Sequence, residues 1–472
     1  MDNVWYFGNL LALLLRWTTG QHSYSGEASP PMFGDYEAQR HWMEVTVNLE
    51  VRQWYTNSTD NDLLYWGLDY PPLTAYHSYL NGKIAQYLNP LWTQLHESRG
   101  FESYYHKIFM RFTVLLVDLL IYFSSIYTYW SICLSSLNAI KPRDKAVNCV
   151  ISLINPALIL IDYGHFQYNC VSLGLVIWTV NCLMRGHDVL AAIVFSLALN
   201  YKQMTLYYAF PIFWYLLSLC FRQPNKFKSF IKFVSISCAV VLTFAILWLP
   251  YLQSIDSILQ VLNRIFPVNR GIYEDKVSNF WFSLSVVLKI KKYFTDSMLA
   301  KISAVITLLS AIPSSFLLYR NPTLLNLKYA LVNSSLLFFL FSFQVHEKSI
   351  LMVSICVLLV MDKHPLCCLW FVVISTFSLQ PLLIKDGLMF PYFSLIIFFI
   401  CVFTNAFGDF EIWNPISWRE KVVFFSFISS MIGCLILSVG ALTIPAPKSL
   451  PHIHSVLNCL YSFIHYVVFV VY

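Results

Sequence analysis

Residues 233–252 read FVSISCAVVLTFAILWLPYL, an apolar run without a single charged side chain. A run of about 20 such residues is long enough for a helix to cross the hydrocarbon core of a bilayer. Comparable runs occur at about 4–17, 107–137, 146–161, 170–184, 188–200, 204–221, 299–319, 329–343, 349–361, 366–383, 389–407, 422–444 and 453–472. The pattern predicts an all-α polytopic membrane protein with about 14 transmembrane helices. Several runs are short, so we expect their helices to extend into the polar segments beside them.

The composition excludes a soluble enzyme, a disordered chain and a fibrous protein. Of the 472 residues, 57% are hydrophobic and only 12% are charged, whereas soluble domains are about 25% charged. The net charge of +6 comes from scattered Lys and Arg residues, so we expect no nucleic-acid partner. The 12 Cys residues lie almost all in apolar runs and form no CxxC pair, which argues against a disulfide framework or a zinc site. Without an internal repeat or a Gly/Ser linker, residues 1–472 are best described as one membrane domain.

The orientation follows from Lys and Arg residues in short loops, which favour the cytosolic side. With a cytosolic N-terminus, the cytosolic loops hold Lys141, Arg143, Lys145, Arg185, Arg222, Lys226, Lys228, Arg320, Lys328, Lys363, Arg419 and Lys421. The exceptions are Lys289, Lys291 and Lys292, and we interpret 277–290 as an interfacial segment rather than an extra span. This orientation places the long polar loop 18–105 on the far, luminal side.

The loop 18–105 holds ten of the 25 Asp and Glu residues, in less than a fifth of the chain. Within it, 36–49 and 73–88 have mixed apolar and polar faces and are typical of helices that lie on a membrane. Asn57 begins an Asn-Ser-Thr sequon, a candidate glycosylation site. The run 4–17 before the loop lacks a basic leader, so we interpret it as an uncleaved first span, with a cleaved signal peptide as the alternative.

Five polar motifs interrupt the apolar pattern. They are GDYEAQRHW at 34–42, WGLDYPP at 66–72, DYGHFQYN at 162–169, RIFPVNRG at 264–271 and QVHEK at 344–348. All five are luminal in the preferred orientation. Polar groups at the ends of several spans, gathered on one side, indicate a site at the membrane surface.

Two acids in the loop are candidate general bases. Asp35 could deprotonate a sugar hydroxyl, with a pKa raised by low-dielectric surroundings, or it could cap the helix that follows. Asp69 precedes Tyr70 and two prolines that stiffen the segment. Its alternative is a turn acid that satisfies local backbone donors. The residues alone leave both alternatives open.

Four cationic side chains are candidates to face a phosphate. His346 and Lys348 lie between two spans and could neutralise a phosphate leaving group, although a solvated hairpin loop with a snorkelling Lys is more common. Lys202 and Arg270 are further candidates, each weak alone. The sequence has no P-loop, GxGxxG, GxSxG or HExxH motif.

Longer runs carry a resemblance to a known family. They are SYSG at 23–26, PPMFGDYEAQRHW at 30–42, YWGLDYPPLTAYHS at 65–78, GHFQYN at 164–169, EDKV at 274–277 and FQVHEKS at 343–349. Over nearly the whole chain, the sequence resembles the endoplasmic-reticulum glucosyltransferases of asparagine-linked glycosylation that use dolichyl phosphate glucose. The runs at 37–42 and 73–77 are more similar to the members that add the first glucose than to those that add the second.

The resemblance implies a GT-C fold whose luminal loops form the active site in the membrane of the endoplasmic reticulum. It implies an inverting α-1,3 transfer of glucose from the dolichyl phosphate donor to the nine-mannose oligosaccharide on dolichyl pyrophosphate. It favours Asp35 as the base and Asp69 second, with His346, Lys348, Arg270 and Lys202 near the phosphate; Glu37 and His165 are further substrate-binding candidates within its motifs. We expect no cofactor, because no ligand set calls for a metal.

Three rival functions remain at this point. One is the sibling enzyme that adds the second glucose, and another is a dolichyl-phosphate-mannose enzyme of the same fold. The third is a lipid or sugar transporter, which usually shows internal repeats and acids in mid-membrane. The acids of this chain gather instead in one loop, which favours an enzyme.

Overall fold

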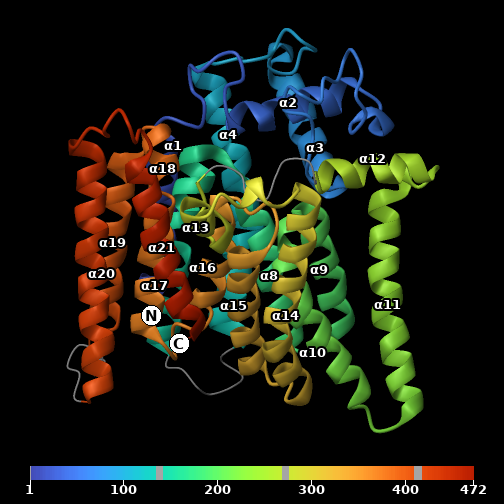
Figure 1. Ribbon diagram of the computed structural model, residues 1–472. Helices are drawn as coiled ribbons and strands as arrows, with labels where there is room; N and C mark the ends of the chain where they lie inside the picture. Colours follow the sequence, from blue (N-terminus) through green and yellow to red (C-terminus); the bar gives the residue numbers. More distant parts are fainter. Residues whose placement is uncertain (1, 134–141, 268–275, 409–416, 472) are drawn as a thin grey trace.

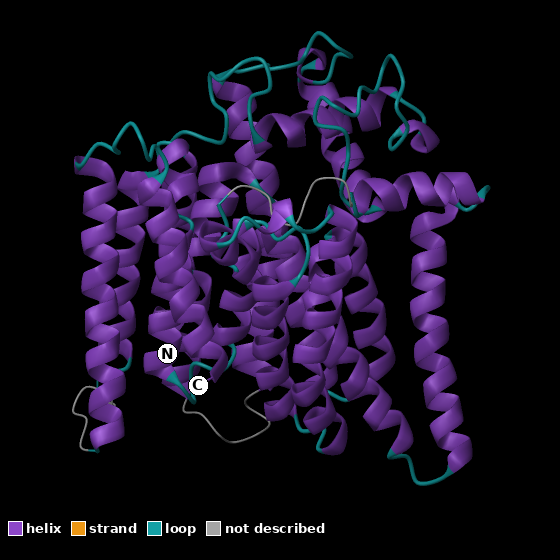
Figure 2. Ribbon diagram, viewed as in Figure 1, coloured by secondary structure: helices purple, strands orange, loops and turns teal. Residues whose placement is uncertain are grey.

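The computed structural model describes residues 2–133, 142–267, 276–408 and 417–471. In these four ranges the chain forms helices joined by loops, and none of the described residues lies in a strand (Figure 2). The predicted all-α class is therefore confirmed for the described part of the chain.

Among the described residues, nine helical segments are long and apolar enough to cross a membrane. They are Tyr104–Ser131, Lys145–Phe166, Gln203–Phe221, Lys226–Tyr251, Asp296–Arg320, Leu324–Phe341, Met389–Ala406, Trp418–Thr443 and Ile453–Val471. Three shorter apolar helices are Asn169–Met184, Asp188–Tyr201 and Pro365–Ser378. The chain is thus a polytopic membrane protein, while the count of about fourteen crossings stays a prediction. The segment 146–161 does extend into its neighbouring motif, since its helix runs on to Phe166.

The α-helices have the following bounds: α1 Asp2–Gly20, α2 Asp35–Asn48, α3 Pro72–Leu88, α4 Tyr104–Val117, α5 Ser124–Tyr127, α6 Pro142–Leu153, α7 Pro156–Ile159, α8 Asn169–Met184, α9 Asp188–Tyr201, α10 Ala209–Phe221, α11 Lys226–Trp248, α12 Ile255–Ile265, α13 Phe280–Val287, α14 Asp296–Arg320, α15 Leu324–Phe341, α16 Ile350–Leu358, α17 Pro365–Ser378, α18 Gln380–Lys385, α19 Met389–Ala406, α20 Trp418–Thr443 and α21 Ile453–Val471. Short 3-10 and π-helical turns join them: η1 Val51–Gln53, η2 Pro90–Trp92, η3 Asp118–Phe123, η4 Thr128–Cys133, η6 Leu160–Phe166, η7 Gln203–Tyr208, η8 Leu249–Tyr251, η10 Ile290–Lys292 and η11 Glu347–Ser349.

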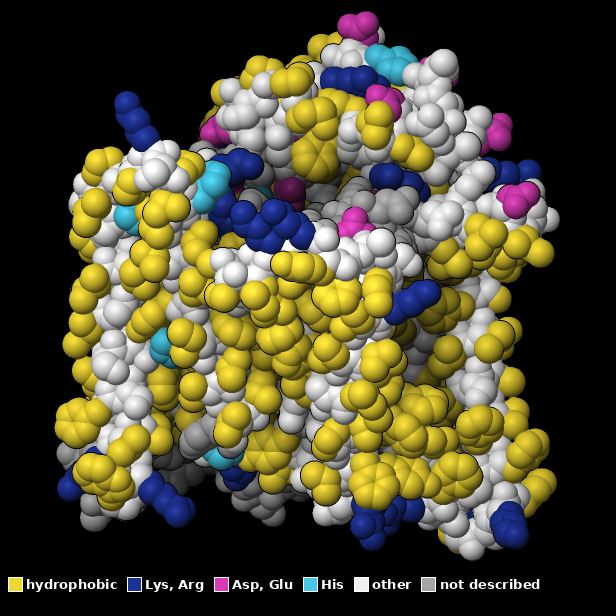
Figure 3. Space-filling model, in the orientation of Figure 1, with side chains coloured by type: hydrophobic (Ala, Val, Ile, Leu, Met, Phe, Trp, Pro, Cys, Tyr) yellow, Lys and Arg dark blue, Asp and Glu magenta, His cyan; other side chains and the backbone are white. Residues whose placement is uncertain are grey.

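The helices form one upright bundle with a layer of loop structure on one face. Figure 1 shows α2 and α3 above the bundle, and both ends of the chain near its opposite face. We call the face that bears residues 18–105 the loop face. On the side shown in Figure 3, a band of apolar side chains covers the bundle, and the Asp and Glu side chains lie toward the loop face. This distribution is what a membrane-embedded bundle requires.

The shorter helices lie in the middle of the bundle. Nearly all residues of α8, α16 and α17 are buried, which explains why these segments are apolar on every side and not along one stripe. The outer helices differ, because α11 and α20 expose large apolar side chains such as Leu242 and Ile436. Such side chains are suited to contact with lipid.

A buried ion pair fastens the first helix to the bundle. The Nε atom of Arg16 lies 2.6 Å from Oδ2 of Asp118, and both side chains are fully buried. The hydroxyl of Tyr163 donates to the same carboxylate oxygen at 2.7 Å. A pair of this kind is costly to break, because either partner alone would leave an uncompensated charge in an apolar interior.

The loop helices differ in part from their prediction. Both expected helices are present, as α2 and α3, but α2 is buried along most of its length and does not lie on an open membrane surface. The reason is its polar side chains, since Arg40 pairs with Glu37 and Glu44 inside the loop layer. The helix that best fits an interfacial position is α12, which the sequence patterns did not single out and which exposes Ile255 and Leu259.

Within the segment 277–290, residues Phe280–Val287 form the eight-residue helix α13. At a rise of about 1.5 Å per residue, such a helix is only about 12 Å long and too short to cross a bilayer. Its length agrees with the interfacial interpretation and not with an extra span.

Candidate active site

The first candidate base lies at the start of α2. The helix begins at Asp35 itself, and its N-cap is Gly34, which makes no side-chain capping bond. The capping alternative for Asp35 is therefore wrong. The backbone N–H of Asp35 donates to the hydroxyl of Ser25 at 3.2 Å, and its carboxylate is directed elsewhere.

Three donors from distant parts of the chain meet one oxygen of this carboxylate. Oδ2 of Asp35 lies 2.7 Å from Nζ of Lys348 and 3.0 Å from Nε2 of His165. The side-chain amide of Gln167 donates to the same oxygen at 2.5 Å. No described residue donates a hydrogen bond to Oδ1 of Asp35. The side chain is 23% exposed, so a ligand can reach this oxygen. One oxygen is thus held by the protein and the other is left for a substrate.

The electrostatics of Asp35 differ from the expectation. Burial raises the pKa of Asp35. The charges of Lys348 and His165 and their hydrogen bonds lower it by more than burial raises it, so the net pKa lies well below the usual range. The sequence-based expectation of a raised pKa is therefore wrong for this structure. That expectation considered only burial, whereas in the structure two cationic partners lower the pKa by more than burial raises it. The carboxylate is therefore ionised, which is the form that a general base must have.

The segment that carries His165 and Gln167 is shaped by a π-helical turn. Residues Leu160–Phe166 form the π-helix η6, and Phe166 has a φ of 89° where the helix ends. Asp162 accepts the backbone N–H groups of Asn169 and Cys170, at 3.1 and 2.7 Å, and so caps α8. Single π-helical turns are frequent at functional sites. Here the turn and the cap together hold the motif 164–169 at the loop face.

Lys202 is a second buried cation at this site. Its ammonium donates to Oδ1 of Asn169 at 2.5 Å and to Oε1 of Gln167 at 3.3 Å. It also lies 5.1 Å from the centre of the Tyr70 ring. Burial and the nearby charge of Lys348 lower the pKa of Lys202. Its hydrogen-bond acceptors are neutral amides, so its positive charge is suited to an anionic ligand.

A cavity of about 600 Å³ brings most of the predicted residues together. Its lining includes Asp35, Asp69, His165, Lys202, His346 and Lys348. A neighbouring cavity of about 220 Å³ shares Asp69 and His346 with it. On the side shown in Figure 3, the surface is hollowed between the loop layer and the bundle, with Lys and Arg side chains on the rim. Both candidate bases thus face a space that can hold a sugar phosphate.

Two of the predicted residues that the structure describes, Glu37 and Asn57, do not line this cavity. Glu37 is buried and accepts two hydrogen bonds from Arg40, each at 2.7 Å, and one from the hydroxyl of Tyr65 at 2.8 Å. Arg270 lies outside the described residues. Asn57 is exposed on the loop layer, as a glycosylation site requires, and its Oδ1 accepts the backbone N–H of Leu63 at 3.2 Å.

Sequence reasoning missed several residues of the site. Gln167 and Arg264 belong to the quoted motifs but were not selected, and Arg264 lines the cavity while it donates to the carbonyl of Gly67 at 2.6 Å. Asp386 lies in none of the motifs, yet its carboxylate contacts His165 at 2.6 Å. A lone acid after an apolar run was the only available signal for it.

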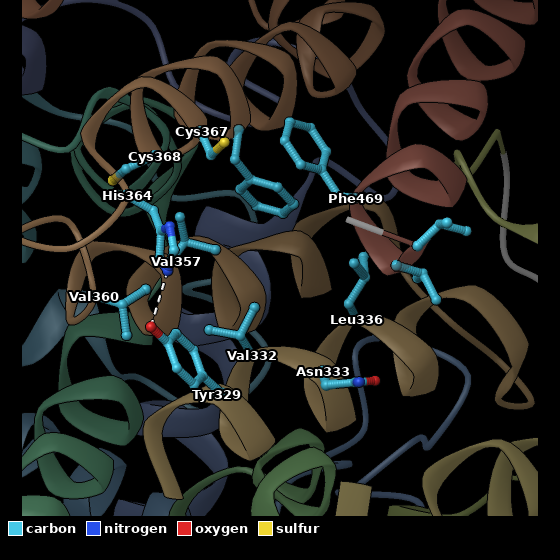
Figure 4. A pocket seen from close by; sticks show the side chains of 13 residues that line it. Tyr329, Val332, Asn333, Leu336, Val357, Val360, His364, Cys367, Cys368 and Phe469 are labelled. Carbon is cyan, nitrogen blue, oxygen red and sulfur yellow. Dashed lines mark hydrogen bonds between the residues drawn. The ribbon is translucent and has the colours of Figure 1, made fainter. Parts of the chain in front are cut away.

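Another large cavity, of about 560 Å³, lies among α15, α17 and α21 (Figure 4). Its walls are mainly apolar, and its polar groups include Asn333 and the hydrogen-bonded pair of Tyr329 and His364, at 2.9 Å. No Asp, Glu, Lys or Arg residue of the described chain lines it. It lacks the groups for acid–base chemistry. Within the described ranges, no group of three or more His, Cys, Asp and Glu residues is arranged to hold a metal ion.

A helical membrane bundle with an ion-paired acid and buried cations around one cavity is typical of an integral-membrane enzyme that acts on an anionic substrate. The chain belongs to the ALG6, ALG8 glycosyltransferase family, whose model matches residues 11–472.

Similar curated proteins cover almost all of the chain. It is 47% identical to the rat dolichyl pyrophosphate Man9GlcNAc2 alpha-1,3-glucosyltransferase over 98% of this chain and 94% of the relative. The chicken protein of the same name is 46% identical over the same shares. A Dictyostelium discoideum protein named as a probable enzyme of this kind is 43% identical over 97% of this chain and 92% of the relative. The predicted resemblance is thus confirmed.

Proposed function

We propose that this protein transfers glucose from dolichyl β-D-glucosyl phosphate to the oligosaccharide Man9GlcNAc2 on dolichyl pyrophosphate, and so forms the first α-1,3-glucosyl linkage with inversion. The names of the rat and chicken relatives specify the acceptor and the linkage, and these relatives match over nearly their whole length. The donor is inferred from the resemblance in sequence and from the cations around the cavity.

The observation that carries the proposal is the asymmetric environment of Asp35. Oδ2 is held by Lys348, His165 and Gln167, which leaves Oδ1 for the acceptor hydroxyl. In the proposed reaction, Oδ1 takes the hydroxyl proton while the sugar oxygen attacks C1 of glucose. The bond between C1 and the phosphate oxygen breaks, and its electrons leave with dolichyl phosphate. A single displacement of this kind inverts the configuration at C1.

The cations have two roles in this proposal. Lys202 and His346 stabilise the leaving phosphate from the cavity wall. Lys348 both holds Asp35 and lines the cavity, so the donor phosphate draws part of its charge away from Asp35. That shift makes Asp35 a stronger base when the donor is bound. Arg270 is a further phosphate ligand in the proposal, and Asp69 is the alternative base.

The remaining features of the proposal concern location and fold. We assign the chain to the GT-C fold and to the membrane of the endoplasmic reticulum, with the loop face in the lumen. The short-loop Lys and Arg pattern supports this orientation. We propose no metal, because side chains alone can hold a monophosphate leaving group.

The test is transfer by purified protein in detergent or lipid discs. Dolichyl phosphate glucose is supplied with either Man9GlcNAc2 or the same oligosaccharide already carrying one glucose, each on dolichyl pyrophosphate. We expect transfer to the unglucosylated acceptor and little to the other. Preference for the glucosylated acceptor would indicate the second-glucose sibling, and transfer to neither would overturn the proposal.

A further inference from the structure

A buried acid that belongs to none of the sequence motifs lies behind the candidate active site. Asp386 follows α18, and its side chain is 2% exposed. Its Oδ2 lies 2.6 Å from Nδ1 of His165, whose side chain is also 2% exposed. Asp386 is not among the residues that line the cavity, whereas His165 is. The hydrogen bond to His165 is therefore the direct contact of Asp386 with the site, and its charge also acts on Lys348 at longer range.

The turn that carries Asp386 is fixed from two sides. The next residue, Gly387, has a φ of 71°, and Leu388 donates its N–H to the carbonyl of Leu383 at 2.8 Å. The hydroxyl of Ser23 donates to the carbonyl of Asp386. A Cβ at position 387 would lie 3.1 Å from the oxygen of Ser23. The turn is thus held against the start of the long loop, where a side chain larger than hydrogen would be strained.

The contact with Asp386 determines which way the imidazole faces. A buried carboxylate only accepts hydrogen bonds, so Nδ1 of His165 must carry a proton toward Asp386. This bond sets the ring plane and directs Nε2 toward the catalytic centre. There Nε2 lies 3.0 Å from Oδ2 of Asp35 and 3.2 Å from Nζ of Lys348. The ring therefore connects the buried acid to the candidate base.

We propose that Asp386 is a positioning residue for glucosyl transfer: by holding His165 through Nδ1, it fixes Oδ2 of Asp35 and so aims Oδ1 at the acceptor hydroxyl. This inference rests on the proposed function and adds a residue to it. The same arrangement, an acid that orients a His which contacts the reacting group, serves other enzymes through geometry and not through proton transfer to the acid. Displacement of a reacting group by about 1 Å can cost about 100-fold in rate.

The test is a double-mutant cycle on the purified, full-length protein with both lipid substrates. We expect Asp386→Ala and His165→Ala each to lower kcat by about 10- to 100-fold. For Asp386→Ala, the KM for the donor should change less than about twofold, because Asp386 does not line the cavity and its loss removes no cation from it. Because the two residues act as one unit, the double variant should be no slower than His165→Ala alone. Asp386→Asn keeps an acceptor oxygen in place, so its kcat should lie between those of Asp386→Ala and the wild type.

A matched control is Asp188→Ala. Asp188 is also buried and pairs with Lys232, but it begins α9, whereas the cavity-lining Lys202 follows the other end of that helix. We expect this variant to keep wild-type kcat, and the thermal unfolding of every variant reports its folding. Wild-type kcat in Asp386→Ala, or losses that add up in the double variant, would overturn the role of Asp386. If Asp386→Ala fails to fold, the role is overturned either by wild-type kcat in Asp386→Asn or by a loss in Asp386→Asn that adds in full to that of His165→Ala. A wild-type protein without transfer activity would instead overturn the proposed function.

Discussion

Nζ of Lys348 lies 2.7 Å from Oδ2 of Asp35, although 313 positions separate the two residues in the chain. The contact joins the start of α2 in the loop layer to the turn η11 before α16. It lowers the pKa of Asp35 and so opposes the effect of burial, which raises that pKa. It also lets one ammonium act on both the base and a phosphate in the cavity.

The pH dependence of transfer should change when Lys348 is replaced by Met. Lys348 lowers the pKa of Asp35, so its removal leaves burial, which raises that pKa, opposed by His165 alone among the two cationic partners. A base with a higher pKa loses its ionised form at a higher pH, and the acid limb of the kcat profile should therefore move upward. Steady-state rates across the pH range measure this shift. Lys232→Met is the control, and an identical acid limb in Lys348→Met would contradict the contact's role.

Replacement of Lys202 by Met should weaken donor binding. The ammonium is buried against the neutral amides of Asn169 and Gln167, so the charge it offers an anion would be lost. A charge-assisted hydrogen bond contributes about 1.5–3 kcal/mol, which predicts a KM for the donor raised by about 10- to 100-fold. The measurement is donor titration at saturating acceptor. An unchanged KM would remove Lys202 from the phosphate site.

Glu37→Gln should affect stability more than catalysis. Glu37 accepts two hydrogen bonds from Arg40 and one from Tyr65, all inside the loop layer. Breaking a buried ion pair by removing one partner costs about 3–5 kcal/mol, although Glu44 remains to hold Arg40 and reduces the loss. Thermal unfolding and steady-state kinetics separate the two effects. A raised KM with an unchanged melting temperature would favour the substrate-binding role expected from the sequence.

Much of the fold is readable from local pattern, because each apolar run overlaps at least one helix of the described chain. The convergence of Asp35, His165 and Lys348 was also indicated, since their motifs were assigned to one face. The pairing of Glu37 with Arg40 had a signal as well, because residues three apart on a helix are neighbours. For Asp386 the sequence offered only a lone acid after an apolar run, since only the folded chain brings residues 165 and 386 together. The pKa direction of Asp35 was missed for the same reason: burial is suggested by sequence, but the ammonium 2.7 Å away is a tertiary contact.

The orientation of the loop face can be tested at Asn57. This residue is exposed, so a luminal loop face predicts that its sequon carries a glycan in cells. Treatment with an endoglycosidase should increase the gel mobility of the wild type and leave Asn57→Gln unchanged. A glycan-free Asn57 together with antibody access to residues 50–64 from the cytosol would contradict the orientation.

The most direct test of the central claim is the rate of transfer by Asp35→Asn beside the wild type and Asp69→Asn, with dolichyl phosphate glucose and the Man9GlcNAc2 acceptor. Loss of a general base lowers rates by about 10²- to 10⁴-fold. We predict a loss in this range for Asp35→Asn, with folding retained, and a smaller loss for Asp69→Asn. Wild-type kcat in Asp35→Asn would contradict the assignment of Asp35 as the base, and a loss confined to Asp69→Asn would transfer that role to Asp69.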